Sequence, residues 1–149
     1  MKETIRALLV LARHDSCEAL RLGLEAQLIE ICTAKNCMEA ALTLCSHCPP
    51  HLVFTDIELS DGNWTDVLSL AACASAPVNV IVVSPHVDVA LYIRAMEGGA
   101  FDFIVCPPGT LELLHVVRVA AGNVFKRRHE ASAVVPTSSP AVASLAEKR

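Results

Sequence analysis

The sequence has no long apolar run, no glycine-rich phosphate loop and no excess of positive charge. Its apolar run from Ala7 to Ala12 is too short for the core of a signal peptide or for a membrane span. The formal net charge of −4 argues against a general nucleic-acid-binding surface. Because the glycine-rich loop is missing, the sequence gives no reason to expect a nucleotide-binding enzyme. We therefore expect a cytoplasmic protein that binds neither membranes nor nucleic acids.

What the sequence does contain is enough apolar material for one folded domain. Of its 149 residues, 53% are hydrophobic, which favours a packed core over disorder. Seven cysteines are an odd number, and no secretory signal accompanies them. The cysteines are therefore predicted to be reduced and mostly buried, as small hydrophobic residues of a cytosolic protein.

Short apolar runs alternate with longer amphipathic stretches along the chain. The runs predict strands over residues 5–11, 28–33, 52–55, 78–83 and 101–105. The stretches between them predict helices over residues 17–28, 36–46, 64–74 and 87–97, and from Thr110 onward. Strict alternation of this kind indicates an α/β fold, a doubly wound five-stranded parallel sheet with helices on both faces.

The last predicted helix carries more apolar residues than one face needs. Its inner face is predicted to contain Leu114, Val117, Ala121 and Phe125. Leu113 and Val116 would then lie on its outer side, where apolar residues favour a protein interface. From residue 130 the chain is rich in Ala, Ser and Pro and shows no period. Residues 130–149 are therefore predicted to form a flexible tail on a domain of residues 1–129.

In an open parallel sheet, ligands bind beyond the carboxyl ends of the strands. The residues that follow the predicted strands are thus the candidates for a functional site. They are Ala12, Arg13, His14, Asp56, Ser84, Pro85 and Cys106.

Three segments resemble the receiver domains of response regulators. Residues 52–62 (LVFTDIELSDG) resemble the third strand and the following loop of that family, residues 81–84 (IVVS) its fourth strand, and residues 95–107 (AMEGGAFDFIVCP) its fifth-strand region. The likeness covers about residues 5–125 in the right order. It implies a CheY-like, flavodoxin-like fold with Asp56 at the phosphoacceptor position, Glu58 in the same pocket, and Phe103 at the position of the family's aromatic switch.

The resemblance also implies a metal site that this sequence does not retain. Members of the family hold Mg²⁺ with the acceptor aspartate and two acidic residues after the first strand. The matching residues here are Ala12 and Arg13; alanine ligates nothing, and a guanidinium repels a cation. A shift of register brings Asp15 nearer, but Asp15 fits better as a helix cap. The Mg²⁺ site is therefore predicted to be lost, which leaves no cofactor.

The groups that hold the phosphoryl group in the family are depleted as well. Cys106 stands in place of the lysine, and Pro85 replaces a residue whose backbone N–H binds a phosphoryl oxygen. Ser84 keeps the hydroxyl of the switch position. Phosphoryl transfer depends on electrostatic stabilisation by such groups. Phosphorylation of Asp56 is therefore predicted to be weak or absent.

Two interpretations of the pocket stay open. In one, Arg13 takes the space of the metal and pairs with Asp56, whose charged form it stabilises. In the other, Asp56 is solvated at the loop and Arg13 points outward. Phe103 is likewise either a switch residue or a core phenylalanine. The Cys106–Pro107 bond is expected to be cis, as in the family, and Cys106 would be reactive if Arg13 lies close.

A group of soft ligands follows the second predicted helix. Cys45, His47, Cys48 and His51 fall within seven residues, whereas structural zinc sites usually use two separated pairs from different elements. A metal-binding or redox protein that uses this group stays an alternative. The basic run at residues 126–129 is expected to complement the dipole at the end of the last helix.

The sequence therefore predicts a signalling module of two-component type that has no catalytic activity and acts through protein–protein contacts. Its partner would be a histidine kinase or a downstream regulator. Residues 87–125 would form the docking face or a homodimer interface. The main alternative is a response regulator that accepts phosphate on Asp56 from a histidine kinase.

Overall fold

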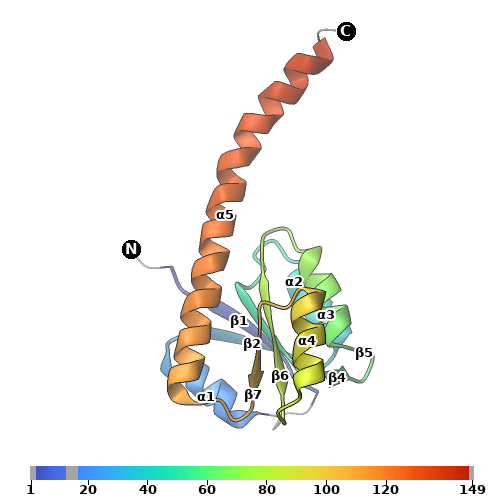
Figure 1. Cartoon of the computed structure of the whole chain (residues 1–149). Coiled ribbons are helices and arrows are strands. Elements are labelled where there is room, and N and C mark those ends of the chain that lie inside the picture. Colours follow the sequence, from blue (N-terminus) through green and yellow to red (C-terminus); the bar gives the residue numbers. More distant parts are fainter. Residues whose placement is uncertain (1–2, 13–16, 148–149) are drawn as a thin grey trace.

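The described part of the chain forms one sheet of five parallel strands in the order β2–β1–β3–β6–β7 (Figure 1). The strands are Arg6–Val10 (β1), Glu30–Ala34 (β2), Leu52–Thr55 (β3), Asn79–Ser84 (β6) and Asp102–Val105 (β7). The computed structural model describes residues 3–12 and 17–147, with side chains as far as residue 132. The predicted α/β fold with a five-stranded parallel sheet is confirmed.

Helices cover both faces of this sheet. Helices α1 (Glu18–Ala26) and α5 (Thr110–Glu147) pack on one face. Helices α2 (Cys37–Leu44), α3 (Trp64–Ala72) and α4 (Val89–Gly98) pack on the other. A short hairpin of β4 (Glu58–Leu59) and β5 (Gly62–Asn63), which the sequence did not predict, leads into α3.

The core has two layers, one on each face of the sheet, because successive side chains of a strand point to opposite faces. Leu9, Phe54 and Ile81 are fully buried on the side of α1 and α5. Leu8 and Val53 are fully buried on the side of α2 and α3. Strand β6 is buried along its whole length. Burial on both faces explains why the strand sequences are almost wholly apolar.

Short polar side chains and a glycine set the ends of the helices. Asn36 caps α2, because its side chain accepts a hydrogen bond from the backbone N–H of Glu39. Asn63 and Asp66 form a reciprocal capping box at the start of α3. Gly99 ends α4 with φ of +108°, a left-handed conformation that suits glycine.

The predicted inner face of α5 is confirmed at Val117 and Ala121 but is wrong at the start of the helix. Leu113 and Val116, which were expected on the outer side, are buried at 3% and 5% exposure, whereas Leu114 is 38% exposed. The physical reason is the contact with α1: a Cβ added to Gly23 would lie 2.6 Å from Leu113 Cδ2, so α5 packs directly on this glycine. The buried stripe therefore contains Leu113, Val116, Val117, Ala120, Ala121 and Val124.

The basic run near residue 127 anchors α5 to the sheet rather than closing the helix. The Asn79 amide donates to Ala120 O and to Asn123 Oδ1, both at 3.0 Å, and its Oδ1 accepts from Arg127 Nη1 at 2.9 Å. Arg128 donates to three carbonyl oxygens, those of Pro77, Pro49 and Pro50. The expected role at a helix end is therefore wrong, because the helix does not end here.

The backbone of α5 stays helical to Glu147 (Figure 1), through the segment for which the sequence predicted an irregular tail. Alanine, the best helix former, recurs in this segment. The domain limit at residue 129 and the flexibility of the tail stay predictions. Within the described residues, no helix has both the length and the apolar character that crossing a membrane requires.

His51 joins β1, β3 and α5 at the amino ends of the strands. It is fully buried, its Nδ1 accepts from the backbone N–H of Arg6 at 3.0 Å, and its ring meets Phe125 edge-on at 4.8 Å between centroids. Burial lowers the pKa of the imidazole, the positive charges of Arg128 and Arg6 lower it further, and Glu3 opposes them. His51 is therefore held in the neutral form.

The buried stripe of α5 allows a prediction about stability. We expect Leu113→Ala to lower the free energy of unfolding by about 2–5 kcal/mol, because it leaves a cavity in the core. Leu114→Ala, the matched control on the next residue, should cost less than about 1 kcal/mol, since its side chain is partly exposed. Urea unfolding of both variants measures the difference, and equal losses would contradict the buried stripe.

The neutral state of His51 predicts the pH dependence of stability. The unfolded chain binds a proton on this imidazole near pH 6.5, whereas the lowered pKa keeps the folded form neutral, so stability falls as pH decreases below about 6.5. His51→Asn keeps an acceptor for Arg6 N–H but does not titrate. We expect this variant to be less stable than the wild type at every pH. Its free energy of unfolding should, however, change less than that of the wild type between about pH 7.5 and about pH 5.5. Equal slopes would show that His51 does not contribute.

Candidate functional site

A cavity of about 350 Å³ lies at the carboxyl ends of the strands, where the strand order reverses between β1 and β3. Asp56 lies at its base, directly after β3. The lining residues are Ala12, Asp56, Ile57, Glu58, Val83, Pro85 and Cys106. The structure thus brings together five of the residues that the sequence nominated and adds two apolar ones, Ile57 and Val83.

Parallel pairing and two backbone contacts hold Asp56 in place. Its backbone N–H donates to Val10 O at 2.9 Å, which extends the β1–β3 ladder by one step. Its Oδ2 accepts from the backbone N–H of Ala12 at 2.8 Å. The end of β1 therefore fixes the main chain of Asp56, and Ala12, two residues after this strand, fixes its carboxylate.

Only part of the segment between β1 and α1 is described, and this part supplies no metal ligand. Leu11 and Ala12, the described residues that follow β1, have no side chain that can ligate a cation. Arg13 and His14 lie outside the described residues, and so do Asp15 and Ser16. The pairing of Arg13 with Asp56 and the cap by Asp15 or Ser16 therefore stay predictions. At the start of α1 the structure places Cys17 as the N-cap residue, without a side-chain hydrogen bond.

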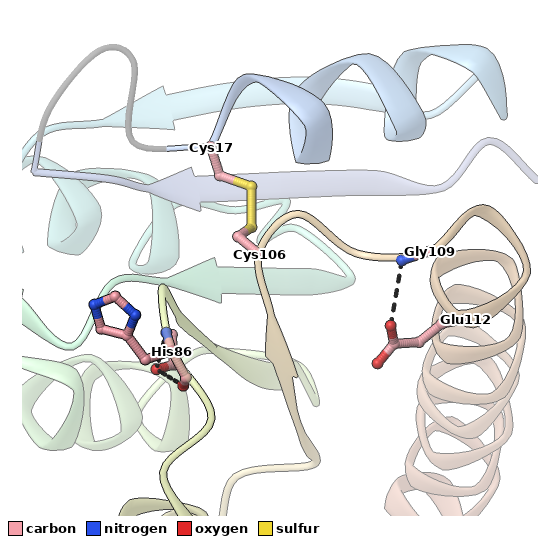
Figure 2. Close-up of a disulfide and its surroundings, with 6 residues drawn as sticks. Cys17, His86, Cys106, Gly109 and Glu112 are labelled. Atoms are coloured by element: carbon pink, nitrogen blue, oxygen red, sulfur yellow. Dashed lines mark hydrogen bonds between the residues drawn. A yellow bond between two sulfur atoms is a disulfide. The ribbon is translucent and has the colours of Figure 1, made fainter.

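Ser84 ends β6 next to the cavity but does not line it. Its hydroxyl is buried, donates to His86 O at 2.6 Å and accepts from His86 N at 3.2 Å. The hydroxyl therefore holds the loop between β6 and α4 together, and Pro85 between these two residues faces the cavity. Figure 2 shows His86 on this loop, across from Cys106.

Phe103 is not a fully buried core phenylalanine, and its role as a switch residue stays a prediction. It lies on β7, partly buried at the edge of the cluster formed around Trp64 and Leu91. Its ring meets Tyr92 of α4 edge-on, with 5.7 Å between centroids. The aromatic pair connects the last strand with the exposed side of α4.

Cys106 forms a disulfide with Cys17, which corrects the prediction that the cysteines are reduced (Figure 2). The two residues are 89 positions apart, with 6.3 Å between their Cα atoms, and they connect the start of α1 with the loop after β7. The cysteines were also predicted to be mostly buried, but Cys32, Cys45, Cys48 and Cys73 are exposed. The Cys106–Pro107 peptide is cis, as expected.

The predicted group of soft ligands does not assemble. Cys45, His47 and Cys48 are exposed, whereas His51 is fully buried among β1, β3 and α5. Among the described residues, no three His, Cys, Asp or Glu side chains are placed to hold one metal ion. Cys37 is separate as well; burial and the Asp61 carboxylate raise the pKa of its thiol to about 11. The metal-binding alternative has no support.

Sequence reasoning missed the partner of Cys106. It treated all the cysteines as reduced and mostly buried; Cys17 is indeed buried, at 7% exposure, but it is bonded to Cys106. The sequence did contain a clue: Cys106 directly follows a predicted strand, and Cys17 follows the loop after another predicted strand. Such positions meet at one edge of a parallel sheet. The helix layer on that face brings them within bonding distance.

Comparisons with known proteins agree with this geometry. The family model of the response regulator receiver domain matches residues 8–118. The transcriptional regulatory protein KdpE of Mycobacterium tuberculosis is 34% identical over 116 residues, which are 77% of this chain and 48% of KdpE. The chain thus spans about half the length of this curated relative.

Solved structures show the same fold. A CheY-like receiver domain protein from Methanospirillum hungatei superposes with a TM-score of 0.70 at 20% identity, over 83% of this chain and 98% of that one. The beryllofluoride-activated NtrC4 receiver domain dimer gives a TM-score of 0.69 at 23% identity, over 80% and 98% of the two chains. With the match to the family model, the strand order and the position of Asp56, the chain belongs to the receiver domains of two-component response regulators.

Proposed function

We propose that this receiver domain signals through protein–protein contacts, with little or no phosphorylation of Asp56 and no catalytic activity of its own. The observation that carries the proposal is the lining of the cavity around Asp56. At two positions where the resemblance places a group that binds the phosphoryl group, the described lining has Pro85 and Cys106 instead. Phosphoryl transfer depends on electrostatic stabilisation of the transferring charge, and neither side chain supplies it.

The residues that would stabilise the transferring charge also differ from those of the family. Pro85 faces the cavity and has no N–H to donate. Cys106 stands where the resemblance places a lysine, and its sulfur is bonded to Cys17. A disulfide sulfur carries no positive charge. Each missing donor or cation of this kind costs about 3–4 kcal/mol of transition-state stabilisation, so together they slow transfer by orders of magnitude.

We propose that the described residues supply too few ligands for a Mg²⁺ site of the kind that the resemblance implies. Mg²⁺ requires near-octahedral oxygen ligation. Among the described residues, the cavity offers the carboxylates of Asp56 and Glu58, and one Asp56 oxygen already accepts from Ala12 N–H. Leu11 and Ala12 contribute none. The loss of the Mg²⁺ site thus stays part of the proposal, and no step of the mechanism uses the ion.

The alternative is a receiver that accepts phosphate on Asp56 from a histidine kinase. Its support is the retained carboxylate, which faces a cavity large enough for a phosphoryl group. This alternative requires groups outside the described lining to neutralise the added charge. A direct test of the acceptor separates the two.

A surface suited to protein contacts lies on α4. Val89, Tyr92, Ile93 and Met96 are large, apolar and between 37% and 66% exposed. Their spacing of three and four residues places them on one side of the helix, within the predicted docking face of residues 87–125. An exposed apolar stripe of this kind favours a protein partner. We propose that it binds a second copy of this chain, as the NtrC4 receiver, similar in fold, is described as a dimer.

We expect the wild-type chain to stay unmodified when it is incubated with acetyl phosphate and Mg²⁺. Intact-mass measurement would reveal a phosphoryl group as a gain of about 80 Da. The matched gain-of-function variant, Ala12→Asp with Pro85→Ala and Cys106→Lys, restores an acidic ligand, an amide donor and a cation around Asp56, and should gain this mass. Adding Asp56→Ala to that variant should abolish it. A wild-type chain that gains the mass, and loses it in Asp56→Ala, would overturn the proposal.

The α4 surface makes a separate prediction about assembly. We expect the wild-type chain to shift from monomer to dimer across a concentration series in sedimentation velocity. Ile93→Asp places a charge in the stripe and should keep the chain monomeric. Leu42→Asp, at an exposed apolar position on α2, is the control and should dimerise like the wild type. Wild-type chains that remain monomeric throughout would show that this face does not bind a second copy.

A further inference from the structure

We propose that Cys17 and Cys106 form a redox switch, by which thiol–disulfide exchange sets the state of the Asp56 cavity. The inference deepens the proposed function, since it gives an input to a receiver whose phosphorylation is weak or absent. It starts from the position of the disulfide. Cys106 lines the cavity with Asp56, and Cys17 begins α1 (Figure 2).

The disulfide closes one side of the candidate site. Ala12, at one end of the β1–α1 connection, donates to the Asp56 carboxylate. Cys17, at the other end, is bonded to the loop that follows β7. Both ends of this connection are therefore attached to residues that line the cavity. Breaking the sulfur–sulfur bond removes one of the two attachments and leaves the other intact.

The environment of the pair allows exchange at one sulfur. Cys17 is 7% exposed and packs in the core cluster beneath α1 and α5, whereas Cys106 is only partly buried and borders the cavity. An incoming thiolate therefore has access to Cys106. The leaving sulfur of Cys17 lies at the first turn of α1, where free backbone N–H groups stabilise a thiolate.

The chemistry balances with a low-molecular-weight thiol such as glutathione. A glutathione thiolate attacks Cys106 Sγ, a mixed disulfide forms there, and Cys17 leaves as a thiolate that takes up a proton. A second glutathione thiolate attacks the glutathione sulfur of the mixed disulfide and releases Cys106. The two glutathiones are oxidised to one disulfide, and the protein pair gains two electrons. The reverse steps, with glutathione disulfide as the oxidant, restore the bond.

The two redox states present different groups to the cavity and to α5. The oxidised state places a disulfide in the cavity that contains Asp56, whereas the reduced state places a free thiol there. Cys106 also begins the loop of residues 106–109 that leads to Thr110, where α5 starts. At that start, Gly109 N–H donates to Glu112 Oε1 at 3.3 Å (Figure 2). Reduction therefore frees the loop that positions the first turn of α5.

The experiment is a redox titration of the full chain in glutathione buffers of varied ratio, followed by alkylation of free thiols and peptide mass spectrometry. We expect a linked Cys17–Cys106 peptide that goes from nearly complete to absent as the ratio becomes reducing, and returns on reoxidation. A variant with Cys32, Cys45, Cys48 and Cys73 replaced by serine should titrate in the same way, because these exposed residues are outside the pair.

A second measurement separates a switch from a simple structural crosslink. Hydrogen exchange of the reduced wild type, and of Cys17→Ser in either buffer, should show loss of amide protection at residues 106–113 and none in α3. Cys73→Ser should respond to the buffers like the wild type. A pair that stays reduced in every buffer, that resists reduction in the folded chain, or that changes no protection would overturn the inference. All readouts work without phosphorylation or dimerisation, so the proposed function fails or holds independently.

Discussion

The hydrogen bonds between β1 and β3 are the constraint on which the candidate site depends. They align Val10 with Thr55, and one further bond, from Asp56 N to Val10 O, carries the ladder just past the end of the strand. Because a shift of one residue turns every side chain to the opposite face, this register is locked by the core residues Leu8, Leu9, Val53 and Phe54. The carboxylate of Asp56 is therefore presented by the most buried part of the sheet, and changes in the surrounding loops alter its neighbours rather than its place.

This division between a fixed base and variable loops lets a chain keep the receiver fold whichever residues line the pocket. The apolar strands need only hydrophobic side chains with the right period, and this sequence supplies them throughout β3 and β6. The loops at the carboxyl ends lie beyond the strand ladders, so their residues vary without a change in the strand pairing. Fold and pocket chemistry are thus separate properties of this chain, and the family alone does not determine what the pocket does.

The sequence was sufficient where local rules govern the structure. The strand ranges and the ranges of the helices that become α2 and α4 depend on neighbours in the chain, and each was predicted close to its observed position. It was insufficient where distant segments meet. The phase of α5 depends on the contact between Leu113 and Gly23, and the pairing of Cys17 with Cys106 spans 89 positions. The role of His51 likewise depends on Arg6 and Phe125, whereas the sequence suggested its near neighbours Cys45 and Cys48 as partners. Arg13 lies outside the described residues, so its relation to Asp56 stays a prediction.

The two attachments of α5 have a mechanical consequence. Near its start the helix is joined to the loop that carries Cys106, and about five turns later Asn79, Arg127 and Arg128 bind it to the opposite end of the sheet. Between these attachments, the buried residues Leu113, Val117 and Val124 pack α5 against the sheet. The anchored part of the helix therefore sets the direction in which its backbone continues beyond residue 130.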